Sequence, residues 1–121
     1  MSINEVIICG RLTRDCEVKR TPGGTDIVNF RIAVNEWRKK GEKYEEYTNF
    51  FNCVCFNEKL AQYLTKGVKV TIEGSLHYEE WQSENGKRSK TEIKVRQVEF
   101  PPKQSDLQPK QDELYDDEMP F

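Results

Sequence analysis

Residues 26–37, DIVNFRIAVNEW, alternate between apolar and polar side chains. Strict alternation predicts a β-strand with one side in a core and the other side in solvent. The expected core side consists of Val28, Phe30, Ile32 and Val34. The expected solvent side consists of Asn29, Arg31, Asn35 and Trp37. A large aromatic ring, that of Trp37, therefore falls on the side where polar residues are expected.

Four further strands are predicted around this stretch, over residues 3–12, 47–56, 68–81 and 89–100. Residues 3–12 are apolar on both parities, which predicts a strand buried on both faces. In the last strand the apolar parity changes between Val95 and Val98, which indicates a β-bulge. The charged residues 38–43 predict a hairpin tip between the second and third strands.

One short helix is predicted between the third and fourth strands. Asn57 is a suitable N-cap residue, and Gly67 is a typical C-terminal stop. Between them, Leu60, Ala61 and Leu64 share one face, which we expect to pack against the strands.

Five strands with one short helix between strands three and four are the element order of an OB-fold barrel, an all-β architecture. A ferredoxin-like order needs a second helix, and immunoglobulin-like sandwiches use more strands. We therefore expect residues 1–101 to form a five-stranded OB-fold barrel. Residues 102–121 are rich in Pro, Gln and acidic side chains, so a disordered linker with an acidic tip is predicted there.

Charge divides the chain at the same place. The 121 residues allow one core and carry a formal net charge of -2. Residues 1–100 hold 17 Lys and Arg against 15 Asp and Glu, whereas residues 101–121 hold two against six. No apolar run approaches the roughly 18–20 residues of a membrane span. The first residues also lack the pattern of a secretory signal, so we expect a cytoplasmic location without membrane contact.

Catalysis and metal binding are not expected. The four cysteines, Cys9, Cys16, Cys53 and Cys55, form no C-x-x-C pair, and His77 is the one histidine. A zinc site needs ligands at closer, matched spacings, and a nucleophilic triad needs partners that are not evident around His77. We predict reduced structural thiols, no metal, no cofactor and no enzymatic activity.

The positions of four aromatic residues favour a binding function. Trp37 and Trp81 fall on the polar sides of their strands, and Phe50 and Phe56 share a parity with Asn52. One alternative is that a bulge or a barrel corner turns these rings into the core. If they are exposed, unpaired nucleobases can cover them, because stacking is worth about 1–3 kcal/mol per base and tolerates any sequence.

Cations must accompany such rings to hold the phosphates. The candidate DNA-binding cations are Arg11, Arg20, Arg31, Arg38, Lys39, Lys59 and Lys66. Each of these can instead be an ordinary solvated surface charge.

The end of the chain is a second candidate binding element. It combines acidic and apolar residues, namely Asp116, Asp117, Glu118, Met119, Pro120 and Phe121. An apolar anchor beside a carboxylate cluster is typical of a peptide ligand for a basic-rimmed pocket, so we expect a partner-binding tip. The alternative is an acidic tail that only promotes solubility.

Seven segments together resemble one known family: NEVIICGRL (4–12), RTPGG (20–24), FRIAVN (30–35), FFNCVCF (50–56), YLTKG (63–67), IEGSL (72–76) and DDEMPF (116–121). In this order they resemble the bacterial single-stranded DNA-binding proteins, including phage and plasmid members. The resemblance covers nearly the whole chain. The chain departs from the family at Glu79 and Glu80, where family members often carry basic residues.

The resemblance implies a protein that coats single-stranded DNA during replication, recombination and repair. It implies that Trp37, Phe50, Phe56 and Trp81 stack on bases. It also implies that Lys59 and Lys66 lie near the DNA path, that the tip recruits partner proteins, and that the chain forms homotetramers. Two alternatives stay open on the sequence alone: an RNA-binding OB-fold module and a protein-binding adaptor.

Overall fold

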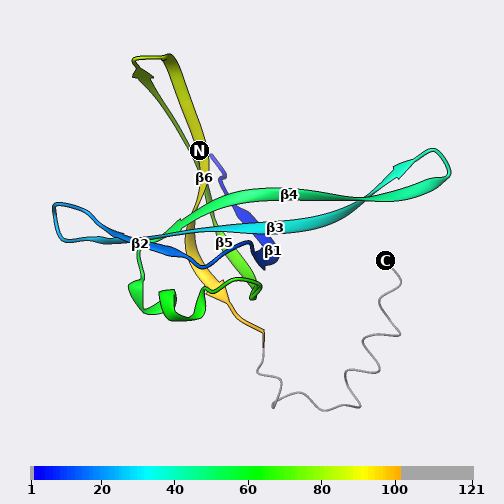
Figure 1. Cartoon of the computed structure of the whole chain (residues 1–121), viewed down its shortest axis with the longest axis horizontal. Helices are drawn as coiled ribbons and strands as arrows, with labels where there is room; N and C mark the ends of the chain where they lie inside the picture. Colours follow the sequence, from blue (N-terminus) through cyan, green and yellow to red (C-terminus); the bar gives the residue numbers. More distant parts are fainter. Residues whose placement is uncertain (1, 102–121) are drawn as a thin grey trace.

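The computed structural model describes residues 2–101, which form six strands and one short helix (Figure 1). In chain order the elements are β1 (Val6–Leu12), β2 (Glu17–Arg20), β3 (Asp26–Lys40), β4 (Lys43–Cys55), η1 (Glu58–Tyr63), β5 (Lys69–Ser83) and β6 (Gly86–Glu99). Those residues contain no helix long and apolar enough to cross a membrane.

Five of the strands close into a barrel. They are hydrogen-bonded in the order β1-β5-β6-β4-β3, and the ring closes where Arg11 of β1 pairs with Ala33 of β3. β4 and β6 run parallel, with Cys53 opposite Ile93, whereas the other neighbouring pairs are antiparallel. This closed all-β barrel with one short helix confirms the predicted OB fold.

The sixth strand, β2, was not predicted. It forms a short hairpin with the start of β3, where Val18 pairs with Val28, and it lies outside the closed ring. All four of its residues are exposed, so no alternation of apolar and polar side chains marks it in the sequence.

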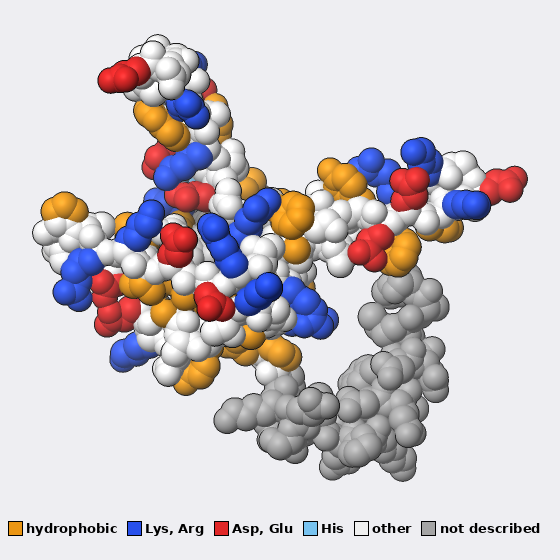
Figure 2. All heavy atoms as spheres, viewed as in Figure 1, with side chains coloured by type: hydrophobic (Ala, Val, Ile, Leu, Met, Phe, Trp, Pro, Cys, Tyr) orange, Lys and Arg blue, Asp and Glu red, His pale blue; other side chains and the backbone are white. Residues whose placement is uncertain are grey.

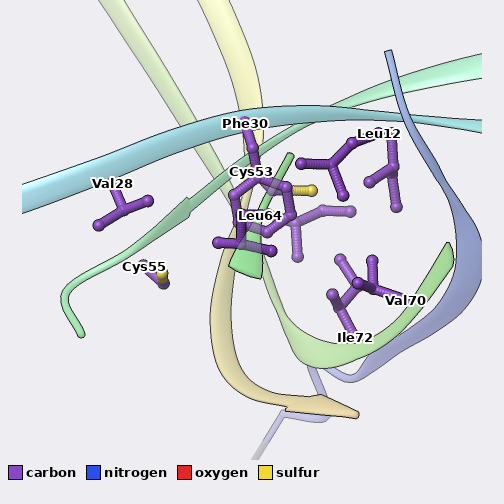
Figure 3. Packing of buried hydrophobic residues seen from close by; sticks show 10 residues of the cluster. Leu12, Val28, Phe30, Cys53, Cys55, Leu64, Val70 and Ile72 are labelled. Carbon is purple, nitrogen blue, oxygen red and sulfur yellow. The ribbon is translucent and has the colours of Figure 1, made fainter. Parts of the chain in front are cut away.

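The core lies inside the ring and uses the predicted side of β3 (Figure 3). Its buried members come from β1, β3, β4, β5 and β6 and from the residue after η1: Leu12, Val28, Phe30, Ile32, Cys53, Cys55, Leu64, Val70, Ile72 and Ile93. Val34 is half-buried against this cluster. The alternation in residues 26–37 therefore predicts correctly which side of β3 is buried.

The prediction that the first strand is buried on both faces is wrong. Val6 and Ile8 pack against the core, but Ile7 is 69% exposed and Cys9 is exposed as well. Residues 2–101 supply no layer over the outer side of β1, so its apolar outer residues contact solvent in the single chain.

The helix is a 3-10 helix, and its boundaries follow from local chemistry. The Asn57 side chain accepts a hydrogen bond from the Lys59 backbone N–H (3.1 Å), which confirms the predicted N-cap. The helix ends at Tyr63, before the predicted stop at Gly67. Leu64 follows directly and is completely buried, so this segment closes one side of the core.

Two long hairpins extend beyond the barrel in different directions (Figure 1). We call residues 35–48 the β3–β4 arm and residues 77–92 the β5–β6 arm. The first is paired as far as Lys40 and Lys43, so its strands continue into the residues predicted as a hairpin tip, and Gly41 (φ 67°) allows its tight turn. The second is paired as far as Ser83 and Gly86. Alternation stops where the core ends, so sequence patterns alone do not predict these boundaries.

A β-bulge occurs where one was predicted, in the last strand. Glu73 pairs with Gln97 and Gly74 pairs with Val95, which leaves Arg96 as the extra residue on β6. A Cβ atom at Gly74 would overlap the backbone carbonyl of Lys94, so the close approach of the two strands requires glycine here. The Arg96 guanidinium binds Glu73 at 2.9 Å.

Candidate nucleic-acid interface

The outer side of β3 and β4 carries two of the predicted rings. Ala33 lies opposite Phe50, and Trp37 lies opposite Glu46, so both rings project from the side of the sheet that faces away from the core. Trp37 is 59% exposed and Phe50 is 53% exposed. Phe56 and Trp81 are similarly exposed. The alternative that barrel geometry turns these rings inward is therefore wrong for all four.

A cation lies directly on one of these rings. The Arg31 guanidinium carbon is 4.3 Å from the centroid of the Phe50 ring, a cation–π contact. A base that approaches Phe50 must either displace this guanidinium or stack on it, and arginine planes stack well on aromatic surfaces. The pair thus offers a flat surface and a positive charge at one place.

A groove of about 600 Å³ lies between β2, the outer side of β3 and β4, and the β5–β6 arm. Its lining is Arg14, Glu17, Lys19, Ile27, Asn29, Val54, Phe56, Glu79, Lys90, Glu92 and Lys94. A smaller adjoining hollow shares Arg14, Asn29, Lys90 and Glu92 and reaches Arg31. The groove therefore leads from the Phe56 ring toward the Arg31–Phe50 pair.

Charges of both signs line this path. Its cations are Arg14, Lys19, Arg31, Lys90 and Lys94, and its carboxylates are Glu17, Glu79 and Glu92. Figure 2 shows Lys and Arg side chains mixed with acidic ones over the centre of the molecule, where the two arms diverge. The excess of positive charge is small, so the groove attracts phosphates less strongly than its cations alone would.

Trp81 lies on the groove side of the β5–β6 arm. It pairs with Arg88, and two residues earlier Glu79 pairs with Lys90, so these four side chains share one side of the arm. The ring is 45% exposed. The arm therefore adds a second aromatic ring with a cation beside it, after the Arg31–Phe50 pair.

Two carboxylates of this arm, those of Glu79 and Glu80, have a lowered pKa. The His77 Nε2 atom is 2.8 Å from Glu79 Oε1, and this hydrogen bond, together with the charge of Lys90, lowers the pKa of Glu79. Lys90 Nζ is 3.9 Å from carboxylate oxygens of both Glu79 and Glu92. The Tyr78 hydroxyl donates to Glu80 (2.6 Å) and lowers the pKa of that group too. At neutral pH a phosphate must therefore compete with carboxylates for Lys90.

The predicted cations divide into two groups. Arg31 lines the path, and Lys39 shares the Trp37 side of the β3–β4 arm. Arg38 lies on the other side of that arm, with its guanidinium carbon 4.1 Å over the Tyr47 ring. The structure does not bring the remaining predicted cations, Arg11, Arg20, Lys59 and Lys66, into the groove lining. Their contact with DNA stays a prediction.

Two of those remaining cations have other partners. Arg11 donates to the Gly67 carbonyl (3.0 Å), and Arg20 forms an ion pair with Asp26 (3.0 Å). These contacts hold the β1 end and the β2 hairpin in place and give both guanidinium groups a local structural role.

Sequence reasoning missed four cations of the groove: Arg14, Lys19, Lys90 and Lys94. A period-two count on β6, started at the turn before Gly86, would place Lys90 and Lys94 on the Trp81 side. No comparable signal marks Arg14 and Lys19, because barrel closure brings their segment beside the β5–β6 arm.

The described residues offer little for metal or thiol chemistry. Residues 2–101 contain no cluster of three or more His, Cys, Asp or Glu side chains that could hold a metal ion. Burial raises the pKa of the Cys53 thiol to about 12 and also raises the pKa of Cys55 and Cys16. These thiols are therefore poor nucleophiles at neutral pH.

The closed barrel, the four exposed rings and the cation-lined groove define an OB-fold binding module. Residues 3–101 match the model of the single-strand binding protein family, and the chain belongs to that family. This membership confirms the resemblance found in the sequence. The predicted tip, residues 116–121, lies outside the described residues.

Several relatives carry the name single-stranded DNA-binding protein. The chain is 41% identical over 101 residues to the one from Treponema pallidum, covering 81% of this chain and 57% of that protein. It is 42% identical over 103 residues to the one from Borreliella burgdorferi, covering 81% of this chain and 69% of that protein. The chain thus spans less than two thirds of the Treponema relative.

A solved structure shows the same fold. The structure described as the Plasmodium falciparum SSB complex with ssDNA superimposes with a TM-score of 0.76 at 24% sequence identity. The match covers 84% of this chain and 97% of the other chain.

Proposed function

We propose that this protein binds and coats single-stranded DNA without sequence preference and without catalysis. The observation that carries the proposal is the exposure of Trp37, Phe50, Phe56 and Trp81 beside a cation-lined groove. Base stacking on such rings contributes about 1–3 kcal/mol per base. Duplex DNA hides the faces of its bases, so this surface selects unpaired strands. The names of the relatives support the same ligand.

The charge pattern predicts a moderate dependence on salt. Each phosphate neutralised on a single strand contributes about -0.7 to the slope of log affinity against log salt. If each of the five cations of the groove and the adjoining hollow neutralised one phosphate, this slope would be about -3.5. Because Glu17, Glu79 and Glu92 share the groove with the cations, we expect a shallower slope.

We also infer that the chain assembles into a homotetramer. The outer side of β1 exposes Ile7 (69%) and Cys9, and Ile3 before it is 92% exposed. Adjoining apolar side chains of this kind often mark a protein–protein interface. Light scattering tests the subunit count, and a monomer at micromolar concentration would contradict the inference.

The last residues, from Asp116 to Phe121, carry the proposed recruitment of replication, recombination and repair proteins. The apolar anchor of this tip is Phe121, so a chain lacking Phe121 should lose partner binding and keep its DNA affinity. Retained partner binding would contradict the anchor role. The cytoplasmic location stays a prediction.

Tryptophan fluorescence titrated with oligo-dT tests the central proposal. We expect strong quenching by oligo-dT, because bases would cover Trp37 and Trp81, and little quenching by a duplex of equal length. Trp37→Ala and Trp81→Ala should each weaken binding by about 5- to 150-fold, the equivalent of one stacked base. Their melting temperatures should stay close to that of the unmodified protein, because neither ring is in the core.

Two outcomes would overturn this proposal. The absence of quenching by oligo-dT would favour an adaptor that binds only proteins. Tighter binding of matched oligo-U than of oligo-dT would favour the RNA-binding alternative.

A further inference from the structure

We propose that Tyr44, near the tip of the β3–β4 arm, is a further base-stacking residue that extends the DNA track beyond Trp37. The inference rests on the proposed function and adds to it a specific residue and a minimum length of bound strand. It follows from the register of the arm, from the exposure of the ring and from the cation opposite it.

The register places Tyr44 on the same side of the arm as Trp37. Lys39 pairs with Tyr44, and Trp37 pairs with Glu46, so Trp37 and Tyr44 are diagonal neighbours across the two strands. Diagonal neighbours have Cα atoms about 7–8 Å apart, within reach of aromatic side chains. The two rings can therefore receive bases from one continuous strand.

The ring of Tyr44 is available for a ligand. It is 65% exposed, more than Trp37, Phe50, Phe56 or Trp81. The arm beyond Asn35 has no core behind either side, because all its residues from Asn35 to Tyr47 are exposed. Within residues 2–101 the Tyr44 ring forms no aromatic pair and no cation–π contact.

A cation lies directly opposite Tyr44, as at other rings of the proposed track. Lys39 is its cross-strand partner, just as Arg88 is the partner of Trp81. Phe50 has the Arg31 guanidinium over its ring. Each of these three sites combines a flat surface for a base with a positive charge for the adjacent phosphate.

Tyr47 on the same arm provides the contrast. It lies on the opposite side, where Arg38 covers its ring at 4.1 Å, and it is less exposed at 44%. The Tyr47 ring faces away from the side of the arm that carries Trp37 and Tyr44, and this orientation separates it from the proposed DNA track. The two tyrosines are therefore suited to a comparison on one hairpin, because Tyr44 lies on the side proposed to bind DNA and Tyr47 lies on the other side.

The position of Tyr44 sets a length requirement. Phe50 lies six positions after Tyr44, which corresponds to about 20 Å along β4. A bound strand must cover this distance in addition to the groove near Phe56. A short oligonucleotide can occupy the groove without reaching the arm tip, whereas a longer one contacts Tyr44 as well.

The test measures the affinity of Tyr44→Ala for labelled oligo-dT of roughly 8 and 20 nucleotides, by fluorescence anisotropy at low salt. We expect about fivefold or greater weakening for the longer oligonucleotide and a smaller effect for the shorter one. Tyr44→Phe keeps the ring and should stay within about twofold of the unmodified protein. Tyr47→Ala, the matched control, should also stay within about twofold.

Three results would overturn the inference: unchanged binding of the longer oligonucleotide by Tyr44→Ala, an equal loss in Tyr47→Ala, or an equal loss in Tyr44→Phe. Trp37→Ala, measured in parallel, separates this inference from the proposed function. If Trp37→Ala weakens binding and Tyr44→Ala does not, the inference alone fails. If neither variant weakens binding, the proposed function fails together with it.

Discussion

Replacing Glu79 by Gln should strengthen binding to single-stranded DNA. Glu79 lies in the groove, within 3.9 Å of Lys90, and its lowered pKa keeps it ionised at neutral pH. The substitution removes one of the two carboxylates near Lys90, with Glu92 remaining at 3.9 Å, and so makes Lys90 more available for one additional phosphate contact. At a slope of about -0.7 per phosphate, this contact increases affinity about eightfold at 0.05 M salt and about threefold at 0.2 M.

The assay is fluorescence anisotropy of a labelled oligo-dT across this range of salt concentration. The slope of log affinity against log salt should become steeper by about 0.7. Glu45→Gln is the matched control. Glu45 forms an ion pair with Lys40 (3.6 Å), and both residues lie on the side of the β3–β4 arm opposite to Trp37. Its affinity should change little. Equal tightening by both variants would show a general effect of net charge and refute the local reasoning, as would unchanged affinity of Glu79→Gln.

Three further outcomes follow from the core and from two titrating sites. Leu64→Ala should lower the free energy of unfolding by about 2–5 kcal/mol, because Leu64 is fully buried; a denaturant titration that finds less than about 1 kcal/mol contradicts its core role. Cys53 and Cys55 should resist alkylation at pH 8 until the chain is unfolded, because burial raises the pKa of both thiols; mass spectrometry of labelled native protein checks this. Glu58→Gln should raise the melting temperature at pH 7 and lose this advantage as pH falls through the raised pKa of Glu58. The neighbouring Asp26 carboxylate raises the pKa of Glu58, so the unmodified protein loses stability as pH rises through that pKa; a difference in melting temperature that stays the same across this pH range excludes the coupling.

Alternation along the sequence predicts the barrel well where one side of a strand packs on the core. It succeeds for β3, where Phe30 and Ile32 are buried and Trp37 is exposed. It fails for β1, because the exposed Ile7 is as apolar as its half-buried neighbours Val6 and Ile8. It also cannot find the four exposed residues of β2.

The sequence predicts those residues of the candidate interface whose side of the sheet follows from counting alternate positions along one strand. The same count that places Trp37 on the outer side places Arg38 on the opposite side, as the structure shows. Lys90 and Lys94 depend instead on the register between β5 and β6, and Arg14 depends on barrel closure. Contacts between segments distant in the chain carry no local pattern, so sequence alone does not show them.

The two arms have a consequence for how such a protein can change over generations. They are two-stranded ribbons beyond the reach of the core, whereas the barrel contains the buried residues that determine cooperative unfolding. Substitutions between residues 36 and 46 can therefore alter the proposed binding surface while the fold persists. Selection can therefore change ligand affinity and the length of bound strand through substitutions in the arms. Gly74 does not tolerate substitution in the same way, because a side chain there would overlap the backbone of β6.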